Sequence, residues 1–147
     1  MKIFIINGPN LNLLGRREPH IYGSLTFESY FEQLQKDFPG HQLFYFQSNH
    51  EGAIVDKLQE FLGSDIQGIV INPAAYTHTS IAIADTLAAI KIPTIEVHIS
   101  DIYNRESFRH FSFVKSQCCQ SFVGFGLEGY RKAVEYLINI TKNVNKK

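Results

Sequence analysis

Hydrophobic residues in this chain form five short, nearly continuous runs, and longer stretches with helical spacing separate them. Five β-strands are predicted from these runs, at 2–7, 42–47, 67–72, 93–98 and 120–125. The runs IFII (3–6) and GIVI (68–71) contain no polar side chain, which is typical of strands that are covered on both faces. The pattern predicts a flavodoxin-like, three-layer αβα fold with a five-stranded parallel sheet.

Helices are expected between the strands. Their apolar faces fall at 27–38, 54–62, 83–88 and 130–138. Gly63 is a suitable C-cap for the second helix, and Thr79 or Ser80 can cap the third. The polar tail at 143–147 is expected to fray.

The segment 8–25 interrupts the regular alternation. It is rich in glycine, proline, asparagine and charged residues, and it is longer than a βα turn requires. Long loops of this kind usually carry function. We therefore expect a single domain over 1–147, with 8–25 as a functional loop.

Charge and hydropathy limit the binding partners and the cellular location that we expect for this chain. Lys plus Arg (14) equals Asp plus Glu (14), so no basic field is available to collect phosphates and nucleic acid is not an expected partner. The chain opens on the strand-like KIFIIN, and no apolar run approaches the length of a membrane span. A cytoplasmic protein with no membrane partner is expected.

Cys118 and Cys119 are adjacent, which suits neither a metal site nor an easy disulfide, so both are expected to be reduced.

Polar residues follow three of the predicted strands. In an open α/β sheet, ligands bind in the crevice beyond the carboxyl ends of the strands. The residues expected to meet there are Asn7, Asn10, Arg17, Tyr22, Asn72, His78 and His98.

Five fragments carry a family resemblance when they are read in order. They are NGPNLNLLGRREPHIYG, SNHEG, NPAAYTHTS, EVHIS and RESFRH. Together they resemble the type II 3-dehydroquinate dehydratases over roughly residues 3–140. The resemblance implies a cofactor-free hydro-lyase that eliminates water from 3-dehydroquinate in the shikimate pathway.

Loss of water β to a ketone needs a base for the α-proton, a stabiliser of the enolate and an acid for the leaving hydroxyl. Tyr22 is the candidate base, although a phenol with a pKa of about 10 is only ~0.1% ionised at neutral pH. A guanidinium at about 4 Å contributes on the order of 4 kcal/mol at an effective dielectric of 20, which lowers the phenol pKa by roughly three. Arg17 can supply that charge. The resemblance implies the same roles and assigns Asn10 to a water near the enolate.

His98 is the candidate acid, because an imidazole titrates near neutral pH. Glu96 and His98 project to the same face of a strand, so the carboxylate can orient the ring. A lone histidine is more often a satisfied polar group, but this one ends an apolar strand at the proposed crevice. The resemblance implies that His98 donates the proton.

Substrate anchoring calls for groups that bind a carboxylate and several hydroxyls. The backbone amides of Ile99 and Ser100 can bind the carboxylate, and Asn72 and His78 suit the hydroxyls. Arg109 offers a planar fork of donors. Read alone, it belongs to a solvated helix face, whereas the resemblance favours it as a substrate ligand.

Two acidic residues raise further expectations. Asp85, read alone, is an exposed helical carboxylate. The resemblance implies that it approaches the active site of a neighbouring subunit in a homododecamer, a tetramer of trimers. Asp101 stands where the family pattern has asparagine, and Tyr103 also departs from that pattern. A negative charge at 101 weakens the binding of a carboxylate unless the side chain caps the following turn or pairs with Arg105.

Gly124, Gly126 and Gly129 form a G-x-G-x-x-G pattern that superficially suggests dinucleotide binding. Such a unit needs a further strand and an acidic residue about twenty positions later. Only one helix remains after these glycines, so they fit a tight strand-to-helix turn better.

Two other classes of protein are compatible with parts of the chain. A flavodoxin-like binding or receiver module has the same fold, but a receiver needs acidic residues where this chain has Asn7 and Asn72. A metallohydrolase could use His78 and His98 on zinc, but no H-E-x-x-H or H-x-x-E-H pattern accompanies them. No metal is expected.

Overall fold

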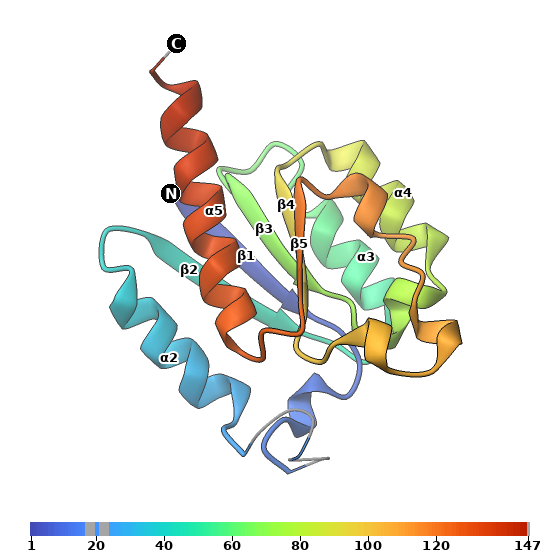
Figure 1. Ribbon diagram of the computed structural model, residues 1–147. Coiled ribbons are helices and arrows are strands. Elements are labelled where there is room, and N and C mark those ends of the chain that lie inside the picture. Colours follow the sequence, from blue (N-terminus) through green and yellow to red (C-terminus); the bar gives the residue numbers. More distant parts are fainter. Residues whose placement is uncertain (17–19, 21–23, 147) are drawn as a thin grey trace.

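The computed structural model describes residues 1–16, 20 and 24–146, which form a parallel sheet with helices on both faces (Figure 1). The strands are β1 (Lys2–Asn7), β2 (Gln42–Gln47), β3 (Gly68–Asn72), β4 (Thr94–His98) and β5 (Gln120–Val123). They are ordered β2-β1-β3-β4-β5, and every neighbouring pair is parallel. The predicted flavodoxin-like αβα fold is confirmed.

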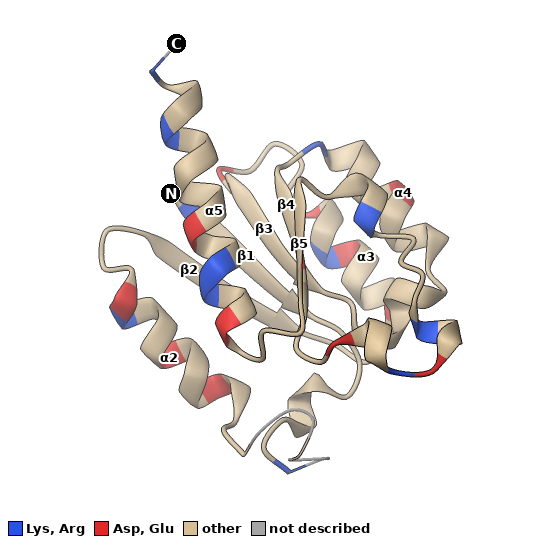
Figure 2. Ribbon diagram, viewed as in Figure 1, with Lys and Arg blue, Asp and Glu red and all other residues tan. Residues whose placement is uncertain are grey.

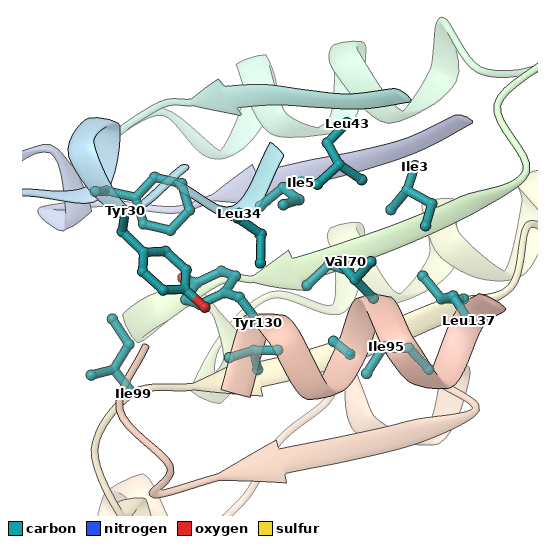
Figure 3. Close-up of a cluster of buried hydrophobic side chains, with 14 of the residues drawn as sticks. Ile3, Ile5, Tyr30, Leu34, Leu43, Val70, Ile95, Ile99, Tyr130 and Leu137 are labelled. Atoms are coloured by element: carbon teal, nitrogen blue, oxygen red, sulfur yellow. The ribbon is translucent and has the colours of Figure 1, made fainter. Parts of the chain in front are cut away.

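Within the described part of the chain, four α-helices cover the sheet. They are α2 (Phe27–Asp37), α3 (Glu51–Gln59), α4 (Ile81–Ile90) and α5 (Glu128–Val144). Figure 1 shows α2 and α5 on one face and α3 and α4 on the other. Because successive strand residues point to opposite faces, Val70 packs in the core under α2 and α5 (Figure 3), while Ile69 and Ile71 pack in the core under α3 and α4.

The helix ends follow local hydrogen bonds. Of the two residues predicted to cap α4, Ser80 does so, because its hydroxyl accepts from the backbone N–H of Ile83 at 3.0 Å. Helix α3 ends at Gln59, earlier than predicted, and Gly63 adopts a φ of 73° within the turn that follows. Helix α5 extends to Val144 and its hydrogen bonding continues to Asn145, so the segment predicted to fray begins within this helix.

Charged residues are distributed over the helices and loops, and Figure 2 shows Lys and Arg interspersed with Asp and Glu. Across the described residues, no helix has the length and apolar character needed to cross a membrane. Cys118 and Cys119 are free thiols.

The carboxyl ends of β1, β3 and β4 lead into short 3-10 helices. These are η1 (Leu11–Leu13) after β1, η2 (Ala74–His78) after β3, and η3 (Ile102–Asn104) and η4 (Ser107–Arg109) after β4. The chain leaves β1 toward β2 and later returns to β3 on the other side, so β1 and β3 flank the topological switch point of the sheet. Ligands of such sheets bind at this position.

Candidate active site

A cavity of about 200 Å³ opens beyond the carboxyl ends of β1, β3 and β4. The predicted site residues that line it are Asn10, Asn72, His78, His98, Ile99, Ser100 and Arg109. These residues are far apart in the sequence, and the parallel sheet brings them to one edge. Arg17 and Tyr22 lie outside the described residues.

Glu96 and His98 lie side by side, as their spacing on a strand predicts. His98 Nε2 is 2.8 Å from Glu96 Oε1, and the two side chains are 5% and 1% exposed. An ionised carboxylate only accepts hydrogen bonds, so Nε2 carries the proton of this contact. The Nδ1 atom of His98 is therefore the ring nitrogen that can exchange a proton with a ligand in the cavity.

Three hydroxyl groups complete the hydrogen bonding of Glu96. Thr77 Oγ1 and Ser112 Oγ donate to Oε1 at 2.5 and 2.7 Å, and Ser121 Oγ donates to Oε2 at 2.9 Å. Burial alone raises the pKa of the Glu96 carboxyl. The hydrogen bonds from His98, Thr77 and Ser112 outweigh burial and hold this pKa well below its ordinary value of 4.5. Glu96 is therefore a fixed negative charge behind the His98 ring.

The depressed pKa of Glu96 predicts a specific loss of stability in acid. A carboxyl whose folded pKa lies below its unfolded pKa contributes stability above the unfolded value, and the contribution disappears as pH falls through the folded value. We therefore expect the difference in free energy of unfolding between wild type and Glu96→Gln to shrink as pH falls below about 4.5. Urea unfolding at a series of pH values from neutral to strongly acidic measures this difference.

Glu135→Gln is the matched control, because Glu135 is exposed on α5. Its unfolding curves should follow those of wild type throughout the series. A Glu96→Gln difference that stays constant with pH would contradict the depressed pKa.

His78 is fixed as a hydrogen-bond acceptor toward the cavity. Its Nδ1 lies 2.7 Å from the carbonyl oxygen of Phe111, which only accepts, so Nδ1 carries the proton. Burial lowers the pKa of His78, which favours the neutral ring. Nε2 is then unprotonated and can accept a hydrogen bond from a hydroxyl.

Among the described residues, two arginines line the cavity, and sequence reasoning selected only Arg109 of these as a ligand. Arg105 Nη1 donates to Ser100 Oγ at 3.4 Å, which places a second guanidinium beside the segment predicted to bind a carboxylate. Glu106 Oε2 is 2.8 Å from Arg109 Nε and 3.9 Å from Arg105 Nε. Guanidinium groups at this position suit an anionic ligand. The RESFRH fragment already contained both arginines, so the signal for Arg105 was present.

The loop after β1 is held by contacts with two other loops. Asn10 has a φ of 69°, a left-handed conformation that asparagine tolerates, and its N–H donates to Asn49 Oδ1 at 3.0 Å. A Cβ on Gly8 would lie 2.4 Å from the carbonyl oxygen of Pro73, so only glycine fits there. These contacts position Asn10 against the cavity.

Asp85 and Asp101 lie apart from the cavity lining. Asp85 is exposed on α4 of this chain. Asp101 caps η3, because its Oδ1 accepts from the N–H of Tyr103 at 3.0 Å and its Oδ2 accepts from Asn104 Nδ2 at 2.8 Å. Capping of the following turn is one of the two arrangements expected to relieve the effect of its charge.

The histidines of the metallohydrolase hypothesis make other contacts. His98 Nε2 lies against Glu96 and His78 Nδ1 against Phe111, with ring centroids 6.4 Å apart. Within the described part of the chain, no group of three or more His, Cys, Asp and Glu side chains is arranged to hold a metal.

The fold and the site define an α/β enzyme whose cavity lies at the switch point of a parallel sheet. A sequence model of the family described as Dehydroquinase class II matches residues 1–138. The chain belongs to the class II dehydroquinase family, a family of hydro-lyases, and the resemblance found in the five sequence fragments is confirmed.

Relatives and solved structures agree with this assignment. The chain is 49% identical over 147 residues to a 3-dehydroquinate dehydratase of Campylobacter lari, covering 99% of this chain and 91% of the relative. It is 52% identical over 137 residues to a catabolic 3-dehydroquinase of Aspergillus clavatus, covering 92% and 91%. The crystal structure of a type II dehydroquinase from Butyrivibrio crossotus superposes with a TM-score of 0.91 at 48% identity, covering 93% of this chain and 97% of that one.

Proposed function

We propose that this chain converts 3-dehydroquinate to 3-dehydroshikimate by trans-elimination of water through an enolate, the third step of chorismate biosynthesis. The family match over residues 1–138 carries this proposal. The cavity supports it, because an imidazole backed by a carboxylate, two guanidinium groups and two asparagines surround a space suited to a small polyhydroxylated acid. No cofactor is needed for this chemistry.

Base and acid are assigned to different parts of the chain in this proposal, the base to the segment 8–25 and the acid to the end of β4. Tyr22 removes the α-proton, and Arg17 stabilises the phenolate that makes this possible. Asn10 holds a water near the enolate oxygen. His98 protonates the leaving hydroxyl from Nδ1, because its Nε2 proton is directed to Glu96 at 2.8 Å.

The remaining lining residues anchor the substrate. The backbone amides of Ile99 and Ser100 bind the carboxylate, in the field of the neighbouring arginines. Arg109 and Asn72 donate to hydroxyl oxygens. His78 accepts from a hydroxyl through Nε2, because its Nδ1 proton is directed to Phe111.

The assembly and location form part of the same proposal. Residues 1–147 act as one catalytic domain with 8–25 as its loop and lid, in a cytoplasmic homododecamer built from trimers. The exposure of Asp85 on α4 supports its place at a contact with a neighbouring subunit, whose active site it would approach.

A direct ultraviolet assay tests the proposed reaction. Elimination places the new double bond in conjugation with the ketone, so absorbance should rise when the purified chain is mixed with 3-dehydroquinate. The rise should persist after exhaustive dialysis against a chelator. Unchanged absorbance with a folded wild-type protein would refute the proposed function.

A further inference from the structure

The phenol of Tyr130 joins two neighbouring strands of the sheet, β1 and β3, behind the cavity. Its hydroxyl donates to Asn7 Oδ1 at 2.7 Å and accepts from Asn72 Nδ2 at 2.9 Å. Asn7 and Asn72 are register partners at the ends of β1 and β3. Tyr130 and Asn7 are fully buried and Asn72 is 3% exposed, so water does not compete freely for these bonds.

Each hydrogen bond between Asn72, Tyr130 and Asn7 has a fixed donor and a fixed acceptor. Asn72 Oδ1 accepts from the backbone N–H of Ala74 at 3.1 Å, so the amide nitrogen of Asn72 must face Tyr130. A phenol has a single proton, and because Tyr130 accepts from Asn72, that proton goes to Asn7 Oδ1. A flip of the Asn72 amide would place its nitrogen against the N–H of Ala74 and leave two buried donors facing each other.

The Asn72 amide is fixed where it meets the cavity. Asn72 and Ala74 both line the cavity, and Ala74 has a φ of 52°, a left-handed conformation that costs free energy for alanine. Of the two hydrogens on Asn72 Nδ2, Tyr130 takes one, and no described residue accepts the second, so it can go to a ligand. The edge that Asn72 presents to a ligand is therefore held from two sides, by the Ala74 N–H at the cavity and by Tyr130 on α5, a helix that does not itself line the cavity.

Tyr130 is itself held rigidly. Its ring packs edge-on against Phe27 with centroids 4.9 Å apart. The ring of Tyr30 lies 6.2 Å from that of Tyr130 (Figure 3). Burial raises the pKa of Tyr130 far above its usual range, so the hydroxyl keeps its proton. A rigid, protonated phenol is suited to fixing the orientation of a neighbouring amide.

We propose that Tyr130 is a positioning residue, whose buried hydroxyl holds the Asn72 amide in the orientation that binds a hydroxyl of the substrate. This inference rests on the proposed function, in which Asn72 is such a ligand. The hydrogen bond from Asn72 to Tyr130 holds an amide that does not react. This bond should therefore contribute equally to the ground state and the transition state.

Tyr130→Phe removes the hydroxyl and keeps the ring. We expect the KM for 3-dehydroquinate to rise about tenfold with kcat within about twofold of wild type, the pattern of lost uniform binding. A double-mutant cycle separates positioning from general damage. In an Asn72→Ala background, Tyr130→Phe should change KM no further, whereas a purely structural defect would add to the effect of Asn72→Ala and overturn the proposal.

Tyr30→Phe is the matched control. Its hydroxyl is buried and has no hydrogen-bond partner among the described residues, and its ring contacts that of Tyr130. It should leave KM unchanged. If Tyr130→Phe does not fold, Asn7→Leu removes the acceptor of the Tyr130 proton and should raise KM in the same way. If wild type is active and the KM of Tyr130→Phe or Asn7→Leu equals that of Tyr30→Phe, the role of Tyr130 is refuted while the proposed function stands. A folded wild type without activity would refute the proposed function itself.

Discussion

Replacement of Tyr22 by phenylalanine is expected to reduce turnover by a factor on the order of 10² to 10⁴, the range typical of general acid and base groups. The substitution deletes the proposed proton acceptor and keeps the aromatic ring. Binding of 3-dehydroquinate should therefore persist. Steady-state kinetics measure the first effect, and titration calorimetry with the slow variant measures the second.

Tyr103→Phe is the control for Tyr22→Phe. Tyr103 is 48% exposed on η3, a segment that adjoins the cavity, and it has no part in the proposed chemistry. Its kinetics should match those of wild type. Turnover of Tyr22→Phe close to that of wild type would exclude this tyrosine as the base.

Replacement of His98 by alanine is expected to lower kcat by a similar factor, on the order of 10² to 10⁴. The variant loses the imidazole Nδ1 that protonates the leaving hydroxyl. Glu96 keeps its hydrogen bonds from Thr77, Ser112 and Ser121, so its charge remains satisfied and the protein should fold. Added imidazole should restore part of the activity, because it can occupy the space left by the ring.

His41→Ala is the matched histidine control. His41 precedes β2 at the opposite end of the sheet, where its Nδ1 lies 3.1 Å from the amino group of Met1. Its activity should be that of wild type and insensitive to imidazole. Turnover of His98→Ala within about tenfold of wild type would rule out His98 as the essential acid.

Much of the fold was readable from the sequence because the sheet is parallel and covered on both faces. Residues 68–71 of β3 are buried and form an uninterrupted apolar run, and such a run is easy to recognise. The ends of α3 and α5 were less predictable. Local hydrogen bonds decide where a helix stops, and the polar residues after position 142 are compatible with either a helix or a frayed end.

The site was partly predictable for a related reason. Once the strands are recognised as parallel, their carboxyl ends must share an edge, so residues such as Asn10, His78 and His98 converge. The groups that support them could not be foreseen. A single hydroxyl has no periodic signature, and Tyr130, 123 residues from Asn7, has the helical spacing of an ordinary core residue.

The capping role of Asp101 has a consequence for how the rim of the site can vary over evolution. Each oxygen of this carboxylate is occupied by its own turn, through Tyr103 and Asn104. Asparagine offers one of those oxygens and caps turns about as well. We therefore expect Asp101→Asn to keep the cap on Tyr103 and to lose only the acceptor for Asn104, so the turn at the rim of the site can form with either amino acid.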